Sequence, residues 1–195
     1  MFLQTCWGVL NQPYVTMRRL AQEGKIHEVI GIFAGSIIFF LFVTPLRADS
    51  FHPLLLTYNF GLLTSGFLFT FFLVVASFYL VGRLLGGAVA LRSIVILWAY
   101  SLLPTLMWFA VTSALFVMLP PPRTVSVMGR LFSIVFTAFC LGLFFWKGIL
   151  YYLTLRFGLR FDLGRIFLAS IILFPLGIVY AVVMYRLGIF RVPFI

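Results

Sequence analysis

Five long apolar runs dominate this chain and restrict what it can fold into. They cover about 29–46, 58–81, 93–119, 131–155 and 166–185. An α-helix needs about 20 apolar residues to cross the hydrocarbon core of a bilayer. A membrane β-strand is shorter and alternates apolar with polar residues, and these runs do not alternate. Because lipid offers no water to backbone polar groups, each run is predicted to be a helix.

Composition supports lipid as the solvent. The chain is 64% hydrophobic and 9% charged, whereas soluble domains have roughly 45–50% apolar and about 25% charged residues. We therefore predict an all-α membrane protein, with a bundle of five transmembrane helices over residues 29–185 and a tail at 186–195. Five spans would use most of the 195 residues, which leaves no room for a separate soluble enzyme domain.

Residues 1–28 are predicted to form two short amphipathic helices, interrupted at Pro13. Trp7 and Tyr14 are suited to the membrane interface, with Arg18 and Arg19 beside them. Two arrangements remain open: the helices lie in the lipid headgroup layer, or they pack on the cytoplasmic face of the protein itself. The apolar residues expected to share a face are Phe2, Leu3, Cys6, Trp7 and Leu10, followed by Tyr14, Met17, Leu20 and Ala21.

The net charge of +10 is predicted to set the topology rather than to bind nucleic acid, since the basic residues are scattered between the apolar runs. Basic residues near spans favour the cytoplasmic side and attract anionic lipid headgroups. One side of a five-span chain would hold eight Lys and Arg residues, against five on the other, with Lys147 nearer the first. The N-terminus is therefore predicted to be cytoplasmic and the C-terminus to lie on the opposite side.

Small residues and prolines inside the spans predict helix packing. Gly31 and Gly35, four apart, would let another helix approach closely. Pro104 and Pro175 should each kink a helix and free a carbonyl, and Tyr100 lies close to the first. Kinked helices shape cavities in transporters, but packing in a plain bundle explains them as well.

Lys147 is the one basic residue inside an apolar run. A lysine at mid-bilayer costs roughly 2.5–3.5 kcal/mol, but at this position its stem can cover most of the way to the nearer interface by snorkelling. Snorkelling is the favoured interpretation. A buried partner or a lipid phosphate is the alternative.

No pattern typical of catalysis, cofactor binding or a metal site is found. None of the four acidic residues falls inside a predicted span, and neither a GxSxG nor an HExxH motif occurs. The histidines have no second metal ligand nearby in sequence, and the two cysteines lie far apart and are expected to be free thiols. The acidic residues, histidines and cysteines concerned are Glu23, Glu28, Asp49, Asp162, His27, His52, Cys6 and Cys140. We predict no catalytic residue, no cofactor and no metal.

The stretch 7–13, WGVLNQP, followed by Met17 and Leu20, resembles the opening of bacterial members of the Yip (Ypt-interacting protein) family. The similarity continues at Gly82 and Gly86 and is strongest at 98–104, WAYSLLP. It extends through Trp146 and the Leu159-x-x-x-x-Gly164-Arg165 pattern.

The resemblance implies five spans with a cytoplasmic N-terminus, in the inner membrane. Eukaryotic relatives bind small GTPases through a longer cytoplasmic region with an acidic Asp-Leu-aromatic-Gly-Pro motif. That motif does not occur here, so GTPase binding is not carried over.

Three functions are compatible with these features. The favoured one is a non-enzymatic membrane scaffold or assembly subunit, as a homo- or hetero-oligomer. The alternatives are a small transporter or lipid-handling protein that uses the prolines and Lys147, and a membrane-shaping protein that uses residues 1–28 as wedges.

Overall fold

The computed structural model describes residues 2–46, 53–88, 90–118 and 127–187, and every regular element in these ranges is a helix. Asp49, His52 and most of the tail lie outside the described residues. In chain order the helices are α1 (Phe2–Asn11), α2 (Pro13–Glu23), α3 (Ile26–Leu46), α4 (Pro53–Leu84), α5 (Leu91–Tyr100), α6 (Leu103–Met118), α7 (Val127–Gly158) and α8 (Leu163–Arg186).

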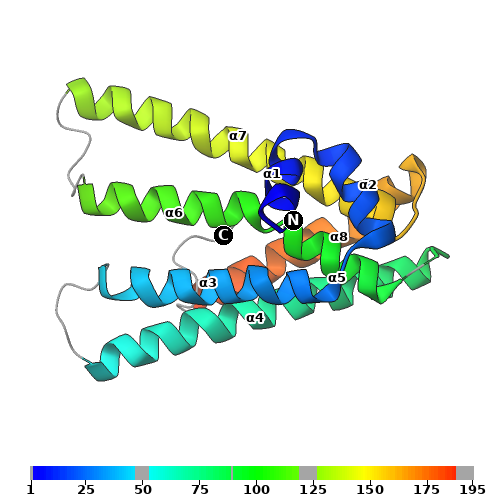
Figure 1. Cartoon of the computed structure of the whole chain (residues 1–195), viewed down its shortest axis with the longest axis horizontal. Coiled ribbons are helices and arrows are strands. Elements are labelled where there is room, and N and C mark those ends of the chain that lie inside the picture. The colour runs from blue at the N-terminus through cyan, green and yellow to red at the C-terminus, as the bar shows by residue number, and fades with distance from the viewer. Residues whose placement is uncertain (1, 47–52, 89, 119–126, 188–195) are drawn as a thin grey trace.

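Five stretches are long and apolar enough to cross a membrane, which confirms the predicted fold class. The third consists of two helices, α5 and α6, over Leu91–Leu115. Successive spans run in opposite directions (Figure 1), so that α3 begins and α8 ends at opposite ends of the bundle. With 32 residues each, α4 and α7 exceed the roughly 20 residues that a span requires.

The short helix α5 is the centre of the packing. It contacts α2, α3, α4 and α7, and its residues Ile94, Leu97 and Tyr100 are fully buried. In the most apolar 18 residues of the third span, 44% of the residues are buried. In the fourth span, Gly129–Gly158, the corresponding share is 6%. The tight core thus surrounds α5, while most of α7 presents apolar side chains to its surroundings.

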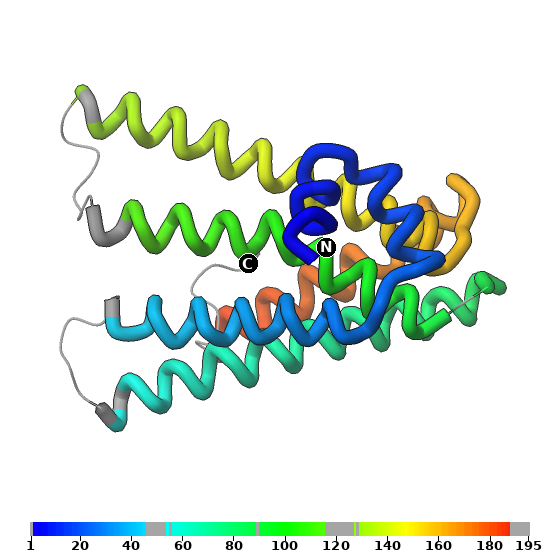
Figure 2. The backbone as a smooth tube through the Cα atoms, viewed as in Figure 1, coloured from blue at the N-terminus to red at the C-terminus, as the bar shows by residue number. Residues whose placement is uncertain are grey.

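Helices α1 and α2 form a hairpin that lies across one end of the bundle, as the tube in Figure 2 shows. Helix α2 packs on α5 and α7, with Met17 and Leu20 buried. Residues 1–28 thus pack on the protein, and their position in the lipid headgroup layer stays a prediction.

The buried side of α1 differs from the predicted face. Val9 is fully buried, whereas Leu3 is 78% exposed and Trp7 is 69% exposed. Positions spaced at three and four residues define several overlapping stripes on a helix this apolar. The neighbours of α1 decide which stripe is buried, and Leu3 and Trp7 remain outside.

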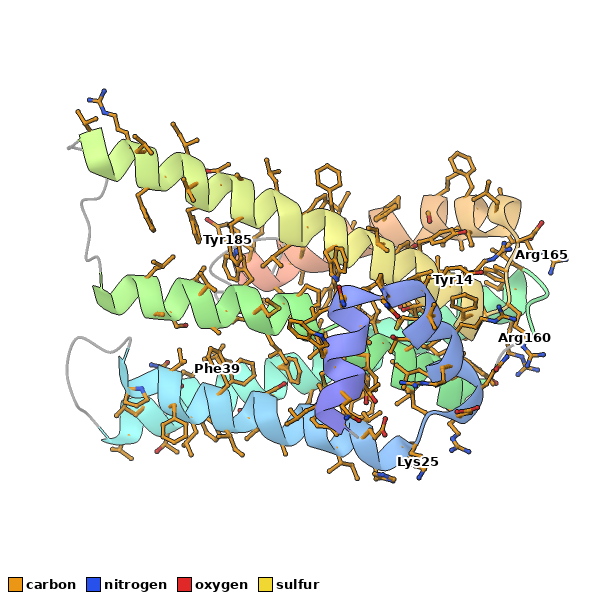
Figure 3. All side chains as sticks on the ribbon, turned by 45° about the horizontal axis from the view of Figure 1, so that its top comes forward. Tyr14, Lys25, Phe39, Arg160, Arg165 and Tyr185 are labelled. Carbon is orange, nitrogen blue, oxygen red and sulfur yellow. The ribbon has the colours of Figure 1, made fainter. Side chains whose placement is uncertain are left out.

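Basic side chains gather at the end of the bundle where the hairpin lies. Figure 3 shows Lys25, Arg160 and Arg165 at this end. We call it the basic end; its described members are Arg18, Arg19, Lys25, Arg83, Arg92, Arg156, Arg160 and Arg165.

Candidate functional site: the break in the third span

The third span is interrupted at Ser101 and Leu102, between α5 and α6. Pro104 has no N–H to donate to the carbonyl four residues earlier, and its ring disfavours a continuous helix. The backbone closes α5 with a tighter turn, in which the N–H of Leu102 donates to the Ala99 carbonyl at 3.1 Å. The sequence predicts a kink at Pro104, and the structure has a break.

Lys147 of α7 holds this break. Its Nζ donates to the backbone carbonyl of Ser101 at 2.7 Å and lies 3.4 Å from the Ser101 hydroxyl. The same ammonium lies over the indole of Trp98, 4.3 Å from the ring centroid, within the range of a cation–π interaction. Lys147 therefore has an internal partner, and the favoured interpretation of snorkelling is replaced by the alternative of a buried one.

A carboxylate reaches the break from another helix. The hydroxyl of Tyr100 donates to Oε2 of Glu28 at 2.7 Å. Sequence reasoning places Glu28 outside the first span, but α3 begins at Ile26, and Glu28 lies in its first turn. A carboxylate is stabilised there by the helix dipole, and this preference is the signal that sequence reasoning missed.

Helix α1 covers the Tyr100–Glu28 contact. The ring of Phe2 lies 6.4 Å from that of Tyr100. Burial raises the pKa of the Cys6 thiol, and the negative charge of Glu28 raises it further. The break is thus held at two consecutive residues: Lys147 of α7 bonds Ser101, and Glu28 of α3 bonds Tyr100. The hairpin lies over the contact between Glu28 and Tyr100.

The other predicted packing residues are placed separately. A Cβ added at Gly31 would lie 3.4 Å from the nearest atom of the Phe2 ring, which is an ordinary van der Waals contact. Gly35 has no atom within 4 Å of the place a side chain would take, so its packing role stays a prediction. Pro175 lies inside α8, which continues through it. Tyr14 packs edge-on against Phe157, 5.2 Å between centroids.

Arg18 and Arg19 are exposed on α2, as expected of interfacial residues, and their contact with lipid stays a prediction. In the part of the chain that the structure describes, no three His, Cys, Asp or Glu side chains are grouped as a metal site would require. Cys6 and Cys140 are free thiols, and Cys140 accepts a hydrogen bond from Trp108 at 3.2 Å.

At the basic end, two loops meet. The N–H groups of Gly86 and Gly87 donate to carbonyls of the last turn of α4, at 3.2 and 2.8 Å, and Gly86 has φ +68°. This is the glycine cap that ends many helices. Arg165 of α8 donates to the Gly86 carbonyl at 3.2 Å and lies 3.6 Å from Asp162. The loop after α4 is therefore also tied to α8.

Comparison with known proteins decides the family. The profile of the Yip1 domain matches residues 7–184. This chain belongs to the Yip1 domain family. The match covers the hairpin from Trp7 onward, four apolar spans in full and the fifth as far as Met184, so the break and its partners lie inside the Yip1 domain. No curated protein and no solved structure matches the chain.

Membership confirms the resemblance noted from the sequence and makes this chain a multi-pass membrane protein. The bacterial character, the inner membrane and the cytoplasmic position of the N-terminus stay predictions. The same holds for the absence of catalysis, cofactors and metals.

Proposed function

We propose that this Yip1 domain is a non-enzymatic membrane scaffold or assembly subunit, with the basic end in the cytoplasm. One observation carries the proposal: Lys147 is bonded inside the protein, to Ser101 and Trp98. An ionisable group in a span is a candidate for transport or catalysis, and here that group maintains the shape of the bundle.

The transporter alternative loses its main support for the same reason. It required a cavity that reaches Lys147. The cavity between α4, α5, α7 and α8 is lined by Trp98 and not by Lys147, and the pocket along α4 beside Tyr58 is not lined by Lys147 either.

The fourth span supplies a surface for assembly. Along α7 the side chains of Ile134, Leu141, Phe144 and Phe145 are exposed, and this span has the smallest buried share of the five. Association in lipid relies on close packing rather than on hydrophobicity, and the exposed side chains of α7 are available to pack against another helix. At the basic end, arginine and lysine side chains would bind anionic headgroups.

A photoreactive residue on α7 tests the scaffold. Benzoylphenylalanine at Phe145, which is 67% exposed, should give a discrete protein adduct in native membranes. The adducted species should keep a fixed stoichiometry in mild detergent. The same variant, purified and reconstituted into vesicles without other proteins, distinguishes a homo-oligomer from a hetero-oligomer. A dimer adduct in these vesicles indicates self-association. Adducts with lipid alone, from a monomeric protein, would refute the proposal.

Membrane shaping is a second candidate, because the hairpin leaves apolar side chains on its outer side. Leu3 and Trp7 point away from the core, and inserting such side chains into one leaflet acts as a wedge. Deleting residues 1–20 would also remove Val9 and Met17 from the core, so that experiment confuses shaping with folding.

The double variant Leu3→Ser, Trp7→Ser avoids this problem. Surface substitutions usually change stability by less than about 0.5 kcal/mol, so thermal unfolding should be unaffected while liposome deformation is lost. The buried Val9→Ser variant is the matched control, which should lose stability. Deformation at the parent level by the double variant would exclude the wedge.

A further inference from the structure

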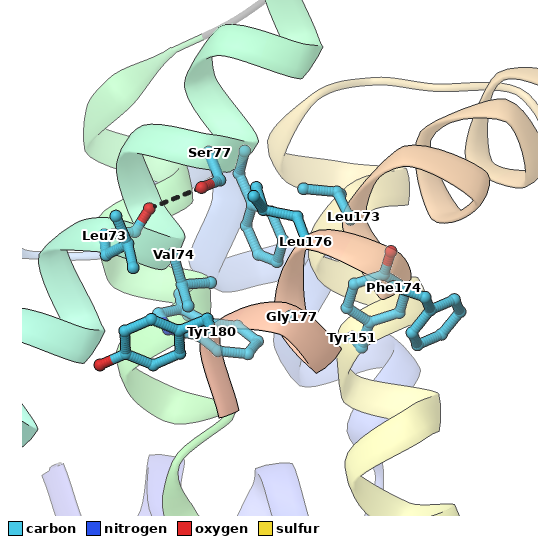
Figure 4. Close-up of a pocket in the computed structure, with 11 residues that line it drawn as sticks. Leu73, Val74, Ser77, Tyr151, Leu173, Phe174, Leu176, Gly177 and Tyr180 are labelled. Atoms are coloured by element: carbon cyan, nitrogen blue, oxygen red, sulfur yellow. Dashed lines mark hydrogen bonds between the residues drawn. The ribbon is translucent and has the colours of Figure 1, made fainter. Parts of the chain in front are cut away.

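A cavity of about 130 Å³ lies among four helices near the break (Figure 4). Its walls come from α4, α5, α7 and α8, which meet here on the side of the bundle away from the hairpin. The lining residues are Leu73, Val74, Ser77, Phe78, Trp98, Tyr151, Leu173, Phe174, Leu176, Gly177 and Tyr180.

The hydroxyl groups in this wall have partners in the protein. Ser77 donates to a carbonyl of its own helix at 2.8 Å. Tyr180 shares a 2.6 Å hydrogen bond with Thr70, and Tyr151 shares one of 3.2 Å with Ser170. A ligand that accepts hydrogen bonds would have to break the bonds that these hydroxyl protons already make, whereas an apolar ligand breaks none, and nearly all of the cavity surface is apolar. The wall therefore selects hydrocarbon.

The cavity opens toward lipid along α8. No atom lies within 4 Å of the place where Gly177 would carry a side chain, and the neighbouring Phe174 and Leu176 are exposed. These residues occupy the middle of the span Leu163–Arg186. At this depth the surrounding solvent is the acyl chains of the bilayer.

Trp98 forms the wall on the side of α5. Its ring packs edge-to-face against Phe78, with 5.1 Å between centroids. The ammonium of Lys147 lies over the same ring in a cation–π contact. An occupant of the cavity would therefore touch the same ring that helps to hold the break. This makes Trp98 a natural reporter of occupancy.

The size suits the end of a single chain. An apolar cavity of about 150 Å³ stays free of water and binds benzene. An empty cavity of this kind also loses dispersion contacts with its lining atoms. We propose that this cavity binds the methyl end of a phospholipid acyl chain, which enters from the bilayer beside Gly177. The site is independent of the scaffold proposal.

Quenching of Trp98 fluorescence by brominated lipid tests the site. In the variant Trp7→Phe, Trp108→Phe, Trp146→Phe, only Trp98 emits. Vesicles of phosphatidylcholine brominated near the methyl end of the chain should quench it, and lipid brominated near the headgroup should quench it less. Filling the mouth by Gly177→Leu should lower the quenching by chain-end bromine at least about twofold, because the chain end is excluded.

Two further variants make the result decisive. Gly142→Leu on α7 also has open space around it but lies outside the cavity, so it should leave quenching unchanged. Val74→Phe fills the cavity from α4 and replaces Gly177→Leu if that variant does not fold. Equal quenching in the parent and in a folded filled variant overturns the proposal, as does a parent that chain-end bromine does not quench.

Discussion

Replacing Lys147 with methionine is expected to lower the free energy of unfolding by about 2 kcal/mol, which changes the folded-to-unfolded ratio by about 30-fold. The variant loses the 2.7 Å hydrogen bond to the Ser101 carbonyl and the cation–π contact with Trp98. A hydrogen bond to a charged group contributes roughly 1.5–3 kcal/mol, and a desolvated cation–π pair about 2.

The sign of this effect depends on the reference state. Methionine is far cheaper than lysine to place in lipid, by roughly 2.5–3.5 kcal/mol on insertion scales. In a membrane, however, the unfolded state consists of separate inserted helices, where Lys147 can snorkel or find other partners. Most of the insertion cost is thus absent from the comparison, and the lost contacts decide the sign. Because Lys147 also finds partners in the unfolded state, the loss of stability is smaller than the sum of the hydrogen-bond and cation–π contributions.

Unfolding by denaturing detergent in mixed micelles, followed by helix content, measures the loss. The matched control is Val135→Met, an exposed position of the same helix outside the proposed assembly surface, which should be nearly neutral. A double-mutant cycle with Trp98→Leu should give a coupling energy of about 1 kcal/mol. If Lys147→Met is as stable as the parent and the coupling is zero, then Lys147 does not hold the break.

Gly87→Val is expected to destabilise the protein by about 3 kcal/mol, at the upper end for overpacking. A Cβ at Gly87 would lie 2.6 Å from the Phe161 ring, 2.9 Å from the Leu159 carbonyl oxygen and 3.1 Å from the Gly82 oxygen. Two of these neighbours are backbone atoms, which cannot move aside by changing a rotamer. The substitution would push the α4–α5 loop away from the α7–α8 loop.

The neighbouring glycine supplies the control. Gly86 has open space around it but φ +68°, a conformation that asparagine tolerates better than most residues. Gly86→Asn should therefore lose less than about 1 kcal/mol. Thermal unfolding in detergent compares the two variants, and a Gly87→Val loss no larger than that of Gly86→Asn would contradict the steric role of Gly87 beside Phe161 and Leu159.

The residues of the break show how far sequence reasoning reaches in this Yip1 domain. Pro104 and Lys147 were recognisable because a proline and a charge are exceptional inside apolar runs. Their relationship was not, since Lys147 and Ser101 lie 46 positions apart. Glu28 was missed because hydropathy alone sets the edge of a span, whereas the helix begins at Ile26. Trp98 was one aromatic residue among many.

The sequence by itself determined the solvent, the helical class, the five spans and the excess of basic residues on one side of the five-span order. Each of these follows from local composition, because a window of about 20 residues is enough to choose between lipid and water. Only the tertiary structure decided the break at Ser101, the partner of Lys147, the buried side of α1 and the cavity beside Gly177. Lipid is as apolar as the spans themselves, so hydrophobicity does not say which side of a span faces a neighbour. That choice is made by shape and by a few polar contacts between residues far apart in the chain.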